Sequence, residues 1–293
     1  GTNTDRSKYD GYLLVDSQQL NDFGAESLLL GGLRDTSGTD IVMNVAGVDV
    51  VVDNAGSELV APELLLASKG DIRVTTGSKM ATRGKLSGAP SDYVLATAYQ
   101  EVIDTKGTPW TSDDVLINPA LDQGGVVRLS DGGLIALKRD AAALDRMKEI
   151  VSDPDKLAAI NALRGTKGLE AIQPGGNIYI ESGATLESSN SVNLDATDQM
   201  LLNPDATLQT RSLGAAAGKI SFGAVPDSVD GLVFANHSLG TLANAAELRL
   251  KSYSSIDFYG PVTLASDRTI TLDSRAFRLM DGSDAKVDIR AKN

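Results

Sequence analysis

Short apolar runs, each ended by turn-forming residues, recur along this chain and constrain its fold more than any other feature. In 48–60 the alternation places Val48, Val50 and Val52 on one face of an extended strand, before a break at 54–56. The same pattern is clearest in 48–80, 175–210 and 247–291, where Gly, Asn, Asp and Ser separate the runs. We therefore expect many short strands joined by tight corners.

Pairs of these runs recur with a spacing of roughly 20 residues, which lies in the range of solenoid coils. We predict an all-β fold of the parallel β-helix (β-solenoid) type, in which inward Val, Leu and Ile side chains stack from coil to coil. The alternative is an antiparallel β-sandwich. That fold usually has strands of about five or six residues and tight two-residue hairpins, whereas the repeated runs here are short and end in other corners.

Composition agrees with thin, regular layers and excludes several classes of function. Aromatic residues make up only 4% of the chain, so the core must be mainly aliphatic. Lys and Arg number 27 against 39 Asp and Glu, and the net charge of −12 argues against binding to nucleic acid or anionic lipid. The absence of cysteine excludes disulfides, cysteine-ligated zinc and thiol catalysis.

The first residues and the hydropathy pattern predict an internal segment of a longer protein that is not embedded in a membrane. No apolar run approaches the roughly 20 residues of a membrane-spanning helix. The first residues show neither an initiator methionine nor a signal-peptide pattern. We expect 1–293 to form one β-helix segment.

The strand rhythm is interrupted by an irregular and helical insertion at about 85–174. Within it, 139–151 has helical spacing, with Leu144, Met147, Ile150 and Val151 on one stripe. A second helix is predicted at 153–164, with Pro154 in its first turn. This helix pair either packs against the side of the stack or projects from it, and a local insertion without a partner is the simpler interpretation.

The insertion also contains Tyr93, Tyr99 and Trp110, the last of which is the only tryptophan. Aromatic side chains anchor many protein interfaces, so these three residues are the candidate contact residues for a partner. The alternative is that they pack the insertion onto the stack.

No catalytic, cofactor or metal site is predicted. His237 is the sole histidine and lies in a turn-rich connection without a nucleophile elbow for a Ser-His-Asp triad. Acidic residues stacked on one outer face could serve a β-helix enzyme that acts on polysaccharides, and the local pairs are Asp113/Asp114, Asp153/Asp155 and Asp195/Asp198. Asp113 and Asp114 would point to opposite faces of a strand, Asp153 and Asp155 lie at a helix start, and Asp195 and Asp198 lie at a turn. Glycine-rich nucleotide signatures are absent. We therefore expect no enzyme.

Three stretches, 21–32, 50–80 and 255–265, resemble segments of filamentous-haemagglutinin-like large exoproteins of the two-partner secretion family. The resemblance implies a right-handed parallel β-helix. It also implies secretion to the bacterial cell surface through a dedicated outer-membrane β-barrel partner. The Asn-Pro-Asn-Leu type of motif that marks the family's N-terminal secretion domain is missing here.

The expected function is therefore that of a structural and adhesive segment of a large secreted surface filament, which attaches to molecules of a host or a neighbouring cell. Two alternatives remain open. One is a polysaccharide-active β-helix enzyme, either a lyase or a glycosidase. The other is the passive stalk of a contact-dependent toxin.

Overall fold

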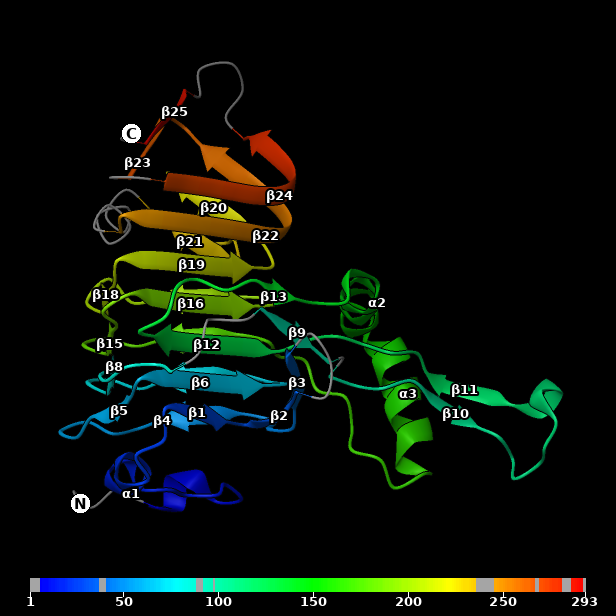
Figure 1. Cartoon of the computed structure of the whole chain (residues 1–293). Coiled ribbons are helices and arrows are strands. Elements are labelled where there is room, and N and C mark those ends of the chain that lie inside the picture. Colours follow the sequence, from blue (N-terminus) through cyan, green and yellow to red (C-terminus); the bar gives the residue numbers. More distant parts are fainter. Residues whose placement is uncertain are drawn as a thin grey trace.

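A computed structural model describes residues 6–36, 41–87, 92–96, 98–235, 245–266, 269–280 and 286–291. Short strands stack on one another along a single axis, with the N- and C-termini at opposite ends (Figure 1). The prediction of a mainly β protein is confirmed.

In the described parts of the chain, the strands form ladders on three sides of this stack. Face A consists of β1 (Ser27–Leu30), β6 (Glu63–Ser68), β12 (Gly125–Ser130), β16 (Ser191–Ala196), β19 (Ser212–Ala217) and the first halves of β22 (Glu247–Tyr259) and β24 (Thr269–Leu279). Face B consists of β4 (Val50–Val52), β7 (Ile72–Val74), β14 (Ile178–Ile180), β17 (Met200–Leu202), β21 (Leu232–Phe234), β20 (Ile220–Gly223) and the second halves of β22 and β24. Face C consists of β5 (Leu59–Ala61), β8 (Lys79–Thr82), β15 (Thr185–Glu187) and β18 (Thr207–Gln209).

The registers between neighbouring strands keep each inward side chain above its counterpart in the preceding coil. On face B, Val50 pairs with Ile72, Ile72 with Ile178, and Ile178 with Met200, all in parallel. Leu186 on face C pairs in the same way with Met80. These residues belong to one continuous apolar core, because a strict period of two sends alternate side chains into the stack.

Polar side chains at the corner before face B repeat with the same spacing. The backbone N–H of Asp71 donates to Asp49 Oδ1 at 2.8 Å, across 22 residues. Gln199 N–H donates to Asn177 Oδ1, again across 22 residues, and Asn177 N–H donates to Asp71 Oδ1 across the insertion. Each coil thus satisfies a corner N–H of the next one. The recurrence of roughly 20 residues seen in the sequence has this ladder as its physical counterpart.

The region 85–174, predicted as an irregular and helical insertion, also contributes a strand to the stack, because β12 occupies a place in face A. It pairs antiparallel with β6 on one side and with β16 on the other. The remaining described pairs of face A run parallel. Strand β12 therefore runs opposite to the other strands of face A. Segments of the insertion precede and follow it in the sequence.

A small lateral sheet covers the outer side of β6 and β12. It consists of β2 (Gly32–Asp35), β3 (Ile41–Val45), β9 (Tyr93–Leu95) and β13 (Leu137–Lys138). Leu65 and Val126 point outward from face A into a second apolar cluster with Met43 and Tyr93. This explains why β6 and β12 are buried along their whole length and why their sequences lack the alternation of a half-exposed strand.

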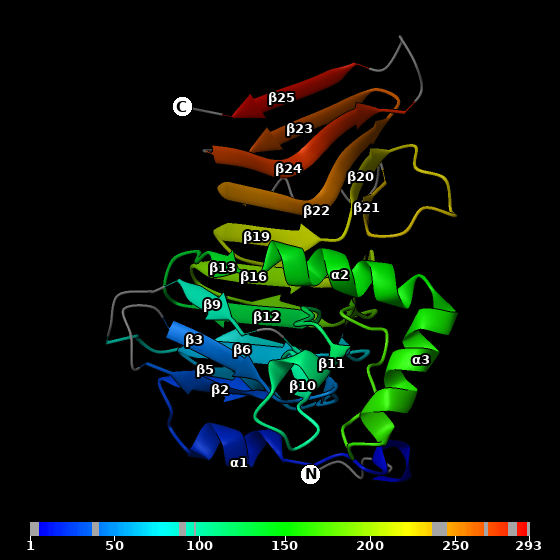
Figure 2. The same cartoon turned by 90° about the vertical axis from the view of Figure 1, so that its right-hand side faces the viewer.

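The rest of the insertion lies on one side of the stack (Figures 1 and 2). It contains the hairpin of β10 (Val102–Asp104) and β11 (Val115–Asn118), with η2 (Thr111–Asp113) between them, and helices α2 (Ala141–Val151) and α3 (Pro154–Gly165). Asp140 and Asp153 cap the N-termini of the two helices, because their side chains accept hydrogen bonds from backbone N–H groups of the first turn. Both helices lie within two residues of the predicted ranges 139–151 and 153–164.

The two ends of the stack carry different elements. At the N-terminal end lie η1 (Arg6–Tyr9) and α1 (Ser17–Asp22). At the C-terminal end, β23 (Val262–Ser266) pairs in parallel with β25 (Val287–Ala291).

Candidate functional site

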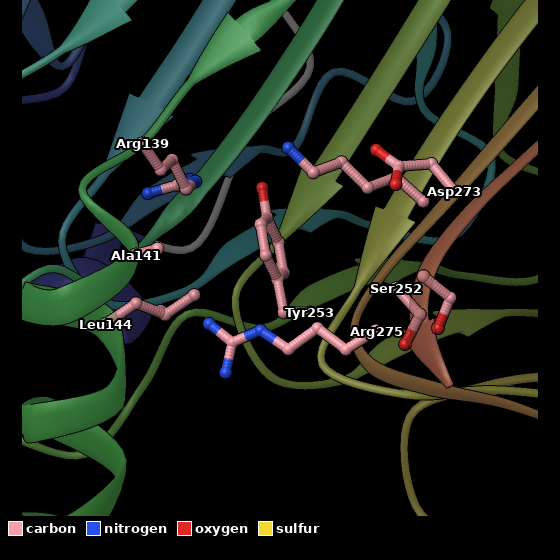
Figure 3. Close-up of a pocket in the computed structure, with 9 residues that line it drawn as sticks. Arg139, Ala141, Leu144, Ser252, Tyr253, Asp273 and Arg275 are labelled. Carbon is pink, nitrogen blue, oxygen red and sulfur yellow. The ribbon is translucent and has the colours of Figure 1, made fainter.

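A small cavity of about 210 Å³ lies between the N-terminus of α2 and strands β22 and β24 (Figure 3). The side chains around it come from the insertion and from the stack. Its lining consists of Arg139, Ala141, Leu144, Lys251, Ser252, Tyr253, Asp273, Ser274 and Arg275.

The Arg139 guanidinium forms the centre of a buried polar network behind this cavity. Its Nε donates to Asp195 Oδ1 at 2.8 Å, and its Nη1 donates to Asp122 Oδ1 at 3.1 Å. Its Nη2 donates to the carbonyl of Gly124. The hydroxyl of Tyr253 donates to the other oxygen of Asp195 at 2.8 Å. Asp195 belongs to β16, so the network joins the insertion to the stack.

Burial controls the protonation of this network. Burial by itself disfavours the charge of Arg139, but the carboxylates of Asp195 and Asp122 outweigh this effect and raise the pKa of Arg139. Burial, reinforced by the charge of Asp195, raises the pKa of Tyr253 well above 10.0. Burial also raises the pKa of Asp122, with Arg139 opposing the shift. Arg139 therefore stays charged and the Tyr253 phenol stays protonated at neutral pH.

The network has little capacity for acid–base chemistry because its groups are occupied by one another. Tyr253 is protonated and already donates to Asp195, and each nitrogen of the Arg139 guanidinium has an acceptor. Within this network, only Asp122 Oδ2 is buried without a hydrogen-bond partner. Removing one member of such a network leaves an uncompensated buried charge. We interpret the cluster as the anchor that holds the insertion against the stack.

A second buried ion pair holds β12 in its unusual place. The Arg128 side chain is 1% exposed and its Nε donates to Glu63 Oε1 at 2.7 Å. Its Nη1 reaches the carbonyl of Gly133 and the hydroxyl of Ser191. Arg128 thus bonds to both of the strands that flank β12, since Glu63 lies in β6 and Ser191 in β16.

A larger, open groove of about 690 Å³ lies on the outer side of face B. Its floor is a row of outward side chains from successive strands, including Arg73, Tyr179, Leu201 and Val233. One rim is the loop that joins β20 to β21, visible at the side of the stack in Figure 2. This groove is the larger of the two hollows. Unlike the Arg139 network, the outward side chains of its floor, such as Leu201, are accessible from solvent.

The three candidate contact residues lie in different environments. Tyr93 is 4% exposed and packs in the lateral cluster. Tyr99 is 6% exposed and packs against α2, with the cations of Lys69 and Arg164 near its ring. Only Trp110, at the tip of the β10–β11 hairpin, is largely exposed, at 71%. Burial removes Tyr93 and Tyr99 from any surface that a partner could reach, because both rings pack the insertion onto the stack.

The carboxylate pairs singled out in the sequence do not converge on a common site. Asp113 accepts a hydrogen bond from Thr108 in the hairpin. Asp153 caps α3, with Asp155 in the first turn. Asp195 is 3% exposed within the Arg139 network, whereas Asp198 lies at an exposed corner. His237 lies outside the described residues.

Sequence reasoning missed both Arg139 and Arg128. Their carboxylate partners are 17 to 65 residues away in the chain, so no local spacing marks them. The sequence did contain one signal for Arg128, which stands inside an apolar strand run. An arginine in a buried strand must have a charged or polar partner.

Neither metal binding nor membrane crossing by a helix has support in the described residues. No group of three or more His, Asp or Glu side chains there is arranged to hold a metal ion. The described helices are too short or too polar to span a bilayer.

Comparison with protein-family models, curated proteins and solved structures found no match.

Proposed function

We propose that this chain is a structural and adhesive segment of a large secreted surface filament, built as a right-handed parallel β-helix. The main support is the series of parallel registers that stacks Val50, Ile72, Ile178 and Met200 in one column. A stack of this kind can be extended coil by coil, because each added layer buries apolar side chains and satisfies the backbone of the previous layer. An experimental structure in which the coil is left-handed would contradict the proposal.

Attachment is assigned to the outward elements, with Trp110 as the leading contact residue. The β10–β11 hairpin carries Trp110 away from the stack and exposes Ile103 and Leu116 on its two strands. Exposed aromatic and aliphatic side chains on a projecting element are typical of contact surfaces. The proposed targets are molecules on host or neighbouring cells, and the proposed route to the cell surface is through an outer-membrane β-barrel partner.

Bead attachment tests this assignment. Beads coated with the protein should adhere to cultured epithelial cells or to neighbouring bacteria, and Trp110→Ser should reduce adhesion several-fold. Leu163→Ser is the matched control, since Leu163 is 42% exposed on α3. Equal loss in both variants would contradict a specific role for Trp110. No adhesion by any of the proteins would favour the passive stalk.

A polysaccharide-active enzyme is the second candidate, and the structure offers it less support. The buried carboxylates Asp122 and Asp195 are held by Arg139. Incubation with acidic polysaccharides, with and without calcium, tests for activity. Release of unsaturated or reducing ends would overturn the adhesive assignment.

A further inference from the structure

The outer groove on face B combines an aliphatic floor with a rim of carboxylates. Leu201 is 47% exposed at the floor, and Val233 and Val229 are partly buried beside it. Asp227 and Asp230 lie on the rim loop and are exposed. The hairpin Trp110 and the Arg139 network lie elsewhere, so this groove is a separate surface.

The charges that line the groove do not cancel. Arg73 is neutralised by Glu181, whose Oε1 lies 2.7 Å from Arg73 Nη1. That contact lowers the pKa of Glu181, so its carboxyl is ionised at neutral pH. Within the described residues, Asp227 and Asp230 have no ion-pair partner. The unbalanced charge of the groove is therefore negative, and a cationic ligand is its electrostatic complement.

The aromatic ring in the floor is not free for a sugar. The guanidinium of Arg73 lies over the Tyr179 ring, 4.2 Å from its centroid. Carbohydrate ligands need an open, flat apolar surface for their C–H faces, and the remaining floor consists of branched aliphatic side chains. A ligand with a flexible methylene chain fits such a floor better.

We propose that this groove binds an extended peptide segment that carries lysine or arginine side chains. The methylene stems of such side chains pack on apolar surface while the charged head stays near water. Here the stems would lie on Leu201 and Val233, and the cationic heads would reach Asp227 and Asp230 in charge-assisted hydrogen bonds. This binding does not depend on the filament role and can be tested apart from it.

Calorimetric titration with a blocked tripeptide, acetyl-Lys-Val-Lys-amide, tests the proposal on the full chain. The double variant Asp227→Asn/Asp230→Asn should weaken binding by about tenfold or more, the equivalent of one charged hydrogen bond. The matched control, Asp113→Asn/Asp114→Asn, removes the same charge from the hairpin and should change the affinity by less than about twofold, as expected for screened surface charge. Equal loss in both double variants would show nonspecific attraction to an acidic protein and would overturn the proposal.

Two further probes separate charge from shape. The variant Leu201→Lys places a cation in the floor itself, so binding of the tripeptide should be lost while the melting temperature stays close to that of the parent. Acetylation of both lysines of the probe should also abolish binding. Retention of binding in either experiment, or tighter binding of maltohexaose than of the tripeptide, would overturn the assignment of a cationic peptide.

Discussion

At the N-terminal end of the stack, α1 lies over the first coil, whereas at the C-terminal end no described element covers the last coil (Figure 1). Leu20 of α1 packs against the apolar core. Asn21 accepts the N–H of Val60 and donates to the carbonyl of Glu58, so its amide satisfies the edge of β5 as a neighbouring strand would. Helix α1 thus covers the apolar core at this end, and the side chain of Asn21 satisfies the backbone groups at the edge of β5.

The C-terminal end leaves the inward column itself uncovered. Phe277 and Leu279 pair in register with the buried Ile256 and Phe258, yet they are 56% and 55% exposed. Among the described residues, β24 pairs only with β22. The N-terminal end also exposes apolar side chains, such as Phe23 at 74%, but these belong to the covering segment. The difference shows that the inward side chains of one layer are buried only when a further layer or a covering element packs on them.

The largest expected effect comes from charging the inward column in the interior. Leu250 is fully buried and pairs in register with Leu272 of β24, one layer nearer the open end. Leu250→Asp should destabilise the protein by several kcal/mol, because an unpaired charge is buried. Leu272→Asp should lower the free energy of unfolding by less than half of that amount, since the side chain at position 272 can reach water. Urea denaturation measures both, and equal losses would contradict the view that the last layer is open.

The next effect concerns the cap at the N-terminal end. Asn21→Ala should lower the free energy of unfolding of this end by about 1–3 kcal/mol, as two backbone groups of the β5 edge lose their partner. Amide hydrogen exchange at Val60 is the direct measurement. Gln18→Ala is the control, because the Gln18 side chain donates to the exposed Asp22 on the same helix and not to β5. Unchanged protection of Val60 in Asn21→Ala would mean that the cap does not hold the edge.

A smaller effect is expected from alkaline pH at the same end. Burial and the hydrogen bond from its hydroxyl to Asp53 raise the pKa of Tyr9 from 10.0 to about 12. The pKa of Tyr9 in the folded state lies above its value in the unfolded state. The protonated hydroxyl therefore contributes fully to the free energy of unfolding below pH 10, and this contribution is lost as the pH rises towards 12. Phenolate absorbance should show more than one tyrosine titrating late, since the pKa of Tyr253 is raised as well, and Tyr9→Phe should lower the number of late-titrating phenols by one. An unchanged number of late-titrating phenols in Tyr9→Phe would show that the pKa of Tyr9 is not raised.

The smallest effect on stability is expected at the exposed aromatic residues of the two ends. Phe277→Ser and Phe23→Ser should each change the free energy of unfolding by about 1 kcal/mol or less, since both rings are largely in water. Binding of a hydrophobic dye should fall more in Phe277→Ser, because Phe277 lies among other uncovered residues of the column. A larger fall in Phe23→Ser would reverse the comparison of the two ends.

Much of the β architecture could be predicted from local pattern. The alternation around Val50 and Val52 marks a strand with one inward face, and the corner residues mark where each strand ends. Helices α2 and α3 could be placed because their apolar spacing and Pro154 are local signals. The antiparallel insertion of β12 could not be predicted, as nothing in a strand's own sequence states the direction of its neighbours.

The candidate sites divide in the same way. Exposure of Trp110 and burial of Tyr99 cannot be separated by residue type, since both are aromatic residues in an irregular segment. The Arg139 network and the groove on face B assemble from coils far apart in the sequence, and their spacing depends on how the coils stack.

The amino-acid sequence by itself determined the strand period, the corners and the two helices, because these depend on contacts between residues close in the chain. Only the tertiary structure decided which strands are neighbours, which aromatic residues are buried and where Arg139 finds Asp122 and Asp195. The physical reason is that burial and pairing depend on the layer above and the layer below, and in this stack those layers come from residues a coil or an insertion away.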